Sequence, residues 1–289
     1  MSFQECIDSA RAALGRAEWD AARQDLDRAE SIASDDAQHA LVALHRASIA
    51  VLRRDGSPDL RVFRENMVRR HSPRHVGLAG YYILIDALDR HATDELERYL
   101  PPFLDAVREL AEPFWDNLAT EVVAAYGSLR GDHDTAIELQ RATLADLDTY
   151  DGPDALLTRV VTTHNLAYSC LAAHRYEEAL AYAQTSLALG EQLGRRDVLA
   201  HILLNAAFAT ICMNRVDEAE GYVGRAAELL AGTRYERYVH YLRGDIARRR
   251  GDFDLAADHF EHLKGLYPGI PDLPEMLIGM NLAPFLLPE

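Results

Sequence analysis

Apolar residues recur along this chain at the three- and four-residue spacing of amphipathic α-helices, and short polar turns interrupt them at regular intervals. Strand formers are sparse, whereas Ala, Leu, Arg, Glu and Asp dominate, so the pattern predicts helix throughout. The predicted helices span residues 3–15, 18–33, 36–54, 58–70, 75–91, 93–111, 114–130, 133–150, 153–173, 176–192, 196–213, 216–231, 235–250 and 253–266.

The same pattern also repeats on a longer scale, as an apolar helix, a short turn and a second helix that opens with an acid and a small residue. The clearest copies begin at His164, Leu204 and Tyr241, and looser ones begin at Asp8 and Glu121. Aligned on one small or apolar position in the second helix, the copies lie 36 to 43 residues apart, with anchors at Ala22, Leu60, Leu96, Ala136, Ala179, Ala219 and Ala256. An aromatic residue three positions before the anchor (Trp19, Tyr176, Phe253) is predicted to wedge the turn.

A helix pair cannot bury its apolar stripe alone, so neighbouring pairs are expected to stack and share a core. No linker interrupts the pattern, and the polar bend at residues 148–154 is the nearest approach to one. We therefore expect one repeat domain over residues 1–270, followed by a Pro-rich apolar tail over residues 271–289.

These copies resemble tetratricopeptide repeats. The resemblance rests on the helix-packing positions Leu166, Ala167, Ala179, Gly244, Ala256 and Phe260, and on Pro268 after the last pair. It implies an all-α fold, a right-handed α-α superhelix of about seven helix pairs with a C-terminal capping segment. The repeats are longer than the usual ~34 residues, which is similar to the long-helix variants in sensor domains of bacterial regulators.

In this family the first helix of each pair lines a concave groove, and the resemblance implies binding residues at the matching positions. These candidates are His45, Arg46, Arg53, Tyr81, Tyr82, His164, Asn165, Tyr168, His201, Asn205, Phe208, Tyr238, Tyr241, Asp245, Arg248 and Arg249. An amide both donates and accepts, so Asn165 and Asn205 suit the backbone of an extended peptide. The alternative is that these asparagines satisfy neighbouring helices and that the Tyr and His residues border the core.

The composition of the chain limits the kinds of partner that it is expected to bind. The formal net charge of −16 argues against direct nucleic-acid binding, which requires a basic surface. Lys264 is the only lysine, an arginine bias that indicates a GC-rich, bacterial genome.

Three scattered cysteines fit buried thiols better than a disulfide framework, and neither a signal-peptide core nor a membrane-spanning stretch is recognisable. The chain is predicted to be cytoplasmic, with no membrane partner.

Catalytic signatures such as a Gly-rich phosphate loop or a His-Glu-x-x-His motif are missing from the sequence. His259 and His262 lie three residues apart on the outer helix of the last pair, where they are expected to face water rather than to hold a metal. We therefore expect no catalysis, no cofactor and no metal.

The tail carries Leu273, Met276, Leu277 and Met280 at helical spacing. Residues 272–282 are predicted to form a short helix that caps the second helix of the last pair near Phe260 and Leu263. The rival prediction is a docking peptide that enters a partner or a neighbouring copy and so makes homo-oligomers.

The sequence thus predicts a protein- or peptide-binding scaffold or adaptor without catalysis. One alternative is the ligand- or peptide-sensing component of a bacterial signalling system. Another, from a different class, is an enzyme built on the same helical scaffold.

Overall fold

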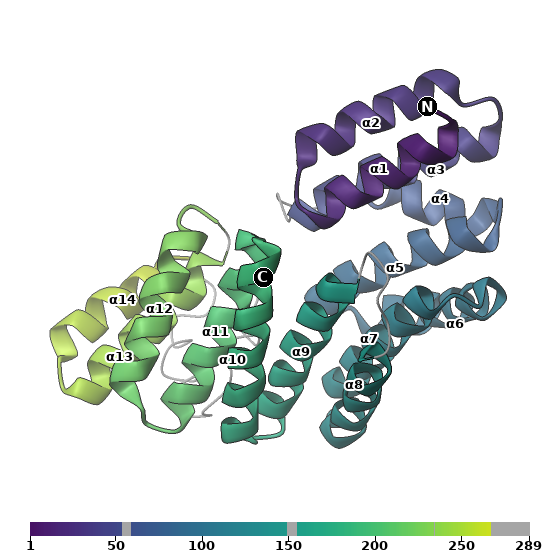
Figure 1. Cartoon of the computed structure of the whole chain (residues 1–289). Helices are drawn as coiled ribbons and strands as arrows, with labels where there is room; N and C mark the ends of the chain where they lie inside the picture. The colour runs from purple at the N-terminus through teal and green to yellow at the C-terminus, as the bar shows by residue number, and fades with distance from the viewer. Residues whose placement is uncertain (54–58, 149–154, 234, 267–289) are drawn as a thin grey trace. The chain divides into compact units, whose positions relative to one another are not determined.

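Helices follow one another along the whole described chain in this computed structural model, which describes residues 1–53, 59–148, 155–233 and 235–266 (Figure 1). These residues contain fourteen α-helices and no strand, which confirms the predicted all-α repeat fold. They form two compact units, unit 1 (Met1–Asp132) and unit 2, which starts at His133.

Unit 1 contains α1 (Phe3–Gly15), α2 (Trp19–Ile32), α3 (Asp36–Arg53), α4 (Arg61–Arg69), α5 (Pro73–Asp89), α6 (Thr93–Leu110) and α7 (Pro113–Leu129). Unit 2 contains α8 (His133–Leu147), α9 (Ala155–Ala172), α10 (Tyr176–Leu193), α11 (Arg196–Cys212), α12 (Val216–Leu230), α13 (Glu236–Arg250) and α14 (Phe253–Leu266).

Pairing follows the predicted repeat. In unit 1 α1 packs on α2 and α5 on α6, and in unit 2 α9 packs on α10, α11 on α12 and α13 on α14. Each second helix also contacts the first helix of the next pair, as α10 does with α11 and α12 with α13. Each of these five pairs therefore buries its apolar stripe within itself, and where a neighbouring pair follows it also buries apolar surface against that pair.

The anchor positions are confirmed as close packing points in six of the seven copies. In each of these the anchor is the fourth residue of the second helix and exposes 4% of its surface or less: Ala22, Leu96, Ala136, Ala179, Ala219 and Ala256. Five of these six anchors are alanines, and a small side chain at this position lets two helix backbones approach one another.

The second copy departs from this register. Helix α4 begins at Arg61, so Leu60 is its N-cap rather than a residue of its first turn. The buried row of α4 instead begins at Phe63 and continues to Met67. The predicted anchor was therefore one turn too early in this copy.

The turns that lead into α2, α6, α8, α10, α12 and α14 share one conformation. Five residues before each anchor the backbone is left-handed, with φ between 53° and 86°, at Ala17, His91, Gly131, His174, Asn214 and Gly251. The N–H of the following residue donates to the carbonyl five residues back, with N···O distances of 2.8 to 3.0 Å. This is the hydrogen bond of the Schellman motif, which satisfies the last carbonyls of the first helix.

Two of the three aromatic residues that were predicted to wedge the turn are partly buried. Trp19 and Tyr176 are partly buried against the core of their units, and Tyr176 also contacts Cys212 of the next pair. Phe253, by contrast, exposes 68% of its surface. Helix α14 is the last described helix, so within the described residues no further first helix follows to cover Phe253. The predicted tail helix at 272–282 lies outside the described residues.

Candidate functional site in unit 2

The first helices of three successive pairs lie side by side in unit 2. Helix α11 contacts α9 on one side and α13 on the other, while α10 and α12 pack behind them. Figure 1 shows the helices of this unit following one another as neighbours from α9 to α14. Side chains from three separate repeats can therefore meet on one surface.

Four rings form a row across this surface. The ring centroids of His164 and His201 are 6.4 Å apart, those of His201 and Tyr235 are 4.5 Å apart, and those of Tyr235 and Tyr238 are 6.1 Å apart. All four side chains are partly exposed. These spacings fall in the range where aromatic rings attract one another, so the row is held together before any ligand arrives. We call these four residues the ring row.

Asn205 fixes one end of the ring row. Its Nδ2 lies 3.1 Å from Nδ1 of His164 and donates to the carbonyl oxygen of His164 at 3.4 Å. Asn205 exposes only 7% of its surface, so its amide nitrogen joins α11 to α9. Its repeat equivalent, Asn165, and also Tyr168 are partly exposed on α9. The two asparagines, expected to be alike, thus have different surroundings.

The cationic side chain of Arg237 lies at the other end of the ring row. The guanidinium of Arg237 sits 5.0 Å from the ring centroid of Tyr238, and its Nη2 donates to the phenol oxygen at 3.3 Å. Sequence reasoning missed Arg237 and Tyr235, which is the N-cap of α13. The spacing of Tyr235 and Tyr238, three residues apart at a helix start, was the available signal.

Two predicted groove residues belong to the core instead. Phe208 and Tyr241 expose 1% and 4% of their surfaces, and their rings stack at 6.1 Å. Helix α11 contacts α9, α10, α12 and α13, and every residue of 202–211 is buried. Burial raises the pKa of the Tyr241 phenol, which stays neutral. The prediction that these two residues face an open groove was wrong.

Asp245, Arg248 and Arg249 form an ion cluster rather than three separate groove charges. The Asp245 carboxylate is buried and accepts from Nε and Nη2 of Arg248 at 3.0 and 2.6 Å, and from Nε of Arg249 at 3.0 Å. Arg249 also donates to Asn214 on the α11–α12 turn, at 3.0 Å. Burying a carboxylate is costly unless cations pair with it. Asp245 therefore stabilises α13 and is not available to a partner.

The unit 1 candidates are distributed differently. His45 and Tyr82 are buried, and Tyr82 packs on Phe63 with ring centroids 5.5 Å apart, which corrects their placement in a groove. Burial, with Arg11 nearby, lowers the pKa of His45 to about 3, so it is neutral at pH 7. Tyr81 is partly exposed.

Arg46 of α3 is exposed, and its guanidinium pairs with two carboxylates of α2. The nitrogen–oxygen distances are 2.6 Å to Asp27 and 3.4 Å to Glu30. The pairing ties α3 to the preceding helix pair. The side chain of Arg53 lies outside the described part.

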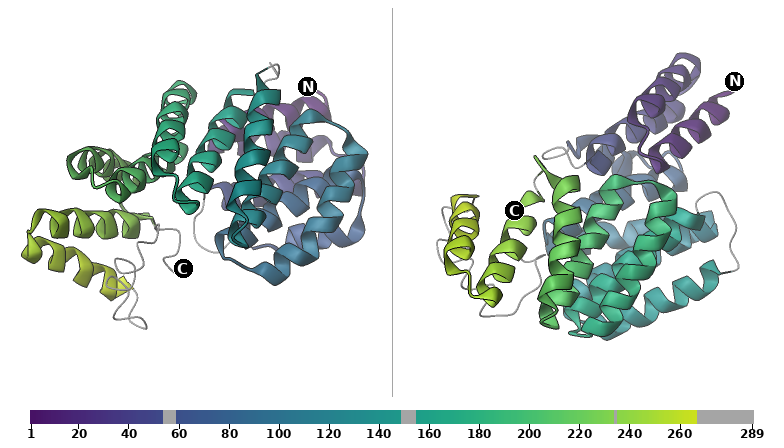
Figure 2. Two further views of the ribbon diagram at one scale, coloured as in Figure 1. Left: turned by 90° about the horizontal axis from the view of Figure 1, so that it is seen from below. Right: turned by 60° about the vertical axis from the view of Figure 1, so that its left-hand side comes forward.

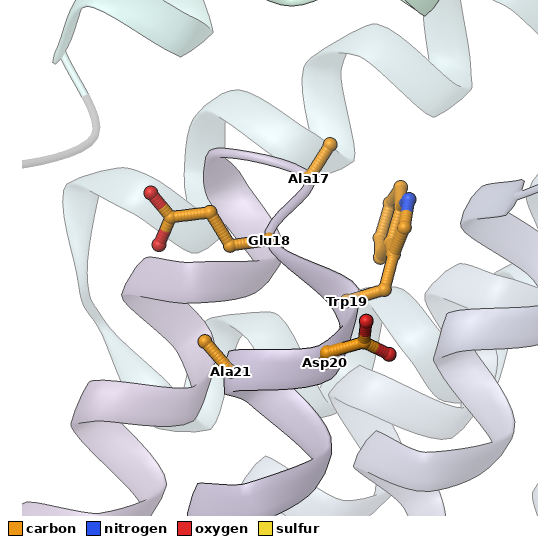
Figure 3. A pocket seen from close by; sticks show the side chains of 5 residues that line it. All are labelled: Ala17, Glu18, Trp19, Asp20 and Ala21. Carbon is orange, nitrogen blue, oxygen red and sulfur yellow. The ribbon is translucent and has the colours of Figure 1, made fainter.

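Figure 3 shows a shallow, open pocket at the turn between α1 and α2. Ala17, Glu18, Trp19, Asp20 and Ala21 line it, with the Trp19 and Asp20 side chains directed to one side of the chain and Glu18 to the other. Glu18 pairs with Arg16 and Asp20 with Arg23, so these carboxylates already have partners. The pocket lacks the converging polar groups of a ligand site.

The described residues contain neither a cluster that could hold a metal ion nor a helix that could span a membrane. Within the described ranges no set of three His, Cys, Asp or Glu side chains is arranged to hold a metal ion. No described helix combines the length and apolar character needed to cross a membrane.

Comparison with known proteins places the fold. No protein-family model matches this chain, and no curated protein matches its sequence. Solved structures do match. A Rap protein complexed with competence and sporulation factor aligns with a TM-score of 0.70 and 13% identity, over 91% of this chain and 75% of that one.

Two further solved structures have a similar fold. The apo form of RapI has a TM-score of 0.57 and 8% identity, over 91% of this chain and 75% of that one. Aspartyl phosphate phosphatase F from Bacillus subtilis has a TM-score of 0.55 and 13% identity, over 98% and 80%. At such identities the likeness concerns the fold alone. Together with the paired helices and their buried anchors, it shows that the chain has a tetratricopeptide-like helical repeat fold.

Proposed function

We propose that unit 2 binds a peptide segment of a partner protein across the surface formed by α9, α11 and α13. The observation that carries this proposal is the ring row, because it sets four partly exposed rings from three repeats beside a cationic side chain. Tyr and Arg are among the residues that most often dominate interface energy. A row of this length suits an extended chain better than a small ligand. The protein acts as a cytoplasmic adaptor without chemistry of its own.

The bound factor in one structural neighbour is consistent with this role, since a protein of the same fold is named there as a complex with competence and sporulation factor. A sensing role is the alternative, in which the same surface takes a signal peptide. Another neighbour is named as a phosphatase. Release of inorganic phosphate from a phosphorylated aspartate in a candidate partner would favour that enzymatic reading.

The test compares two matched tyrosine variants in a pull-down from native lysate, read by quantitative mass spectrometry. Tyr238→Ala, combined with His201→Ala, removes two of the four rings of the ring row, including the ring beside Arg237. Tyr222→Ala removes an equally half-buried tyrosine on α12, a second helix. We expect the first variant to weaken capture of a specific partner about tenfold or more, as loss of a central aromatic anchor does.

The control should retain that partner, and both variants should keep wild-type circular dichroism. Equal capture by the ring-row variant and the wild type would remove the support for this binding surface. The double change Asn165→Ala and Asn205→Ala would not separate binding from packing, because Asn205 also joins α9 to α11.

A further inference from the structure

Three histidines meet where α13 packs on α14. His240 of α13 lies between His259 and His262 of α14, with its Nδ1 3.2 Å from Nδ1 of His259. The His240 and His262 rings stack with centroids 3.9 Å apart, and the His240 and His259 rings are 5.4 Å apart. Both views of Figure 2 show α13 and α14 as adjacent helices at the yellow-green end of the chain. We call these residues the histidine cluster.

The sequence placed His259 and His262 on an outer helix facing water. His262 is indeed exposed, but His259 is half-buried, and both rings are in contact with His240. His240 lies 19 residues before His259 in the sequence and on the preceding helix. Only the pairing of α13 with α14 brings them together.

The geometry limits how many protons the cluster can hold. Two facing imidazole nitrogens share one hydrogen, which one ring donates and the other accepts. One added proton leaves that hydrogen bond intact, because an imidazolium still donates to a neutral ring. A second proton places two donors face to face, and a proton on His262 sets a second cation against the stacked ring. The separated helices have no such limit.

Neighbouring charges act on the cluster from its own two helices. Burial lowers the pKa of His240, with further lowering by His262, His259 and Arg243, while Glu236 acts in the opposite direction. Burial also lowers the pKa of His259, followed by Arg243, and Asp258 opposes them.

Three charged or titratable groups on the other helices that pack on α13 have partners outside the cluster. On α12, Asp217 and Glu220 pair with Arg250, and on α11 the His201 ring contacts Tyr235. The charges that act on His240 and His259 therefore come from the cluster itself and from Glu236, Arg243 and Asp258 on the same two helices.

We propose that the histidine cluster is a proton-sensitive latch, which holds α14 against α13 at neutral pH and releases it on acidification. A histidine in the separated helices titrates near 6.5, whereas burial lowers the pKa of His240 and His259 in the packed pair, so these two rings bind protons only at lower pH. Opening therefore takes up protons once the pH falls below about 6.5. The latch contributes its full stability above that pH, and this stability is lost as the pH falls towards the lowered pKa values of His240 and His259. Opening would expose Leu263, which is fully buried in the closed pair.

The test is hydrogen exchange on the full-length, chelator-treated protein between pH 7.5 and 5.5, with rates corrected for intrinsic exchange. Protection of α14 amides is compared with that of α10 amides in the same unit. Each extra proton taken up on opening raises the opening constant by as much as tenfold per pH unit. We expect α14 protection to fall across this range while α10 protection changes much less.

Variants assign the effect to the cluster. The triple change His240→Gln, His259→Gln and His262→Gln removes titration and should make α14 protection nearly independent of pH. His262→Gln alone, at an exposed position, should reduce the slope if the triple variant does not fold.

His174→Asn is the matched control, because His174 is an exposed histidine of the same unit at a left-handed turn position that Asn tolerates. The control should keep the wild-type slope. An unchanged slope in the histidine-cluster variants, or a parallel fall in α10 protection, would overturn the proposal.

Discussion

At the scale of single residues, Gly244 of α13 is the described glycine that leaves the least room for a side chain. A Cβ added there would lie 2.3 Å from Cε1 of Phe260 on α14, so the ring would have to move. Gly224 of α12 is a matched helical glycine, because a Cβ there would meet nothing within 4 Å. The two positions differ in packing and not in helix propensity.

We therefore expect Gly244→Ala to destabilise the protein by about 1–3 kcal/mol, as overpacking does. Gly224→Ala should instead stabilise it by roughly 0.5–1 kcal/mol, since Ala is the better helix former. Urea unfolding followed by circular dichroism measures both. A stabilising Gly244→Ala would show that Phe260 does not pack on α13 as described.

At the scale of elements, the repeated turn is the feature that the sequence pattern did not reveal. Four of its six left-handed positions carry Ala, His or Asn instead of glycine, so a search for turn glycines finds only Gly131 and Gly251. A non-glycine residue in this conformation costs about 1–2 kcal/mol. The packed anchor that follows each turn offsets this cost.

The turn leading into α2 allows a direct test. Ala17→Gly relieves the strained φ of 57° and should stabilise the protein by up to about 1 kcal/mol, reduced by the greater freedom of the unfolded chain. Ala12→Gly, at an exposed position inside α1, should destabilise it by roughly 0.5–1 kcal/mol. Thermal unfolding of the two variants should move in opposite directions. A fall in melting temperature for both would mean that Ala17 is not strained.

At the scale of the whole molecule, the last described helix pair carries exposed apolar side chains on α14. Phe253 and Leu255 of α14 expose 68% and 46% of their surfaces, an apolar area at the last described pair. Terminal repeats usually need a covering segment, and residues 271–289 are the apolar chain available for it. Their arrangement lies outside the described residues, so the capping helix remains a prediction.

Deleting residues 271–289 distinguishes the two roles of this tail. If it caps α14, the shortened protein should melt at a lower temperature and aggregate, because the uncovered surface is sticky. If it docks into another copy, stability should be unchanged and size-exclusion chromatography with light scattering should show a shift from oligomer to monomer. We expect the first outcome, and an equally stable monomer before and after deletion would contradict both roles.

The sequence by itself determined the helices, their pairing and the alanine anchors. Helical periodicity is local, and a motif repeated every 36 to 43 residues is reinforced by each copy, so thirteen of the fourteen helices begin within about two residues of prediction. Two copies have leucine instead of alanine at the anchor, and of these the register shifted at Leu60 but not at Leu96.

Tertiary structure alone decided which polar and aromatic side chains reach the surface. Phe208, Tyr241 and Asp245 occupy groove positions of the repeat, yet they are buried because α11 and α13 are surrounded by neighbouring helices. The histidine cluster likewise exists only because α13 and α14 pack together. Burial of one helical side chain depends on every helix packed around it, and a one-dimensional pattern records the repeat but not that environment.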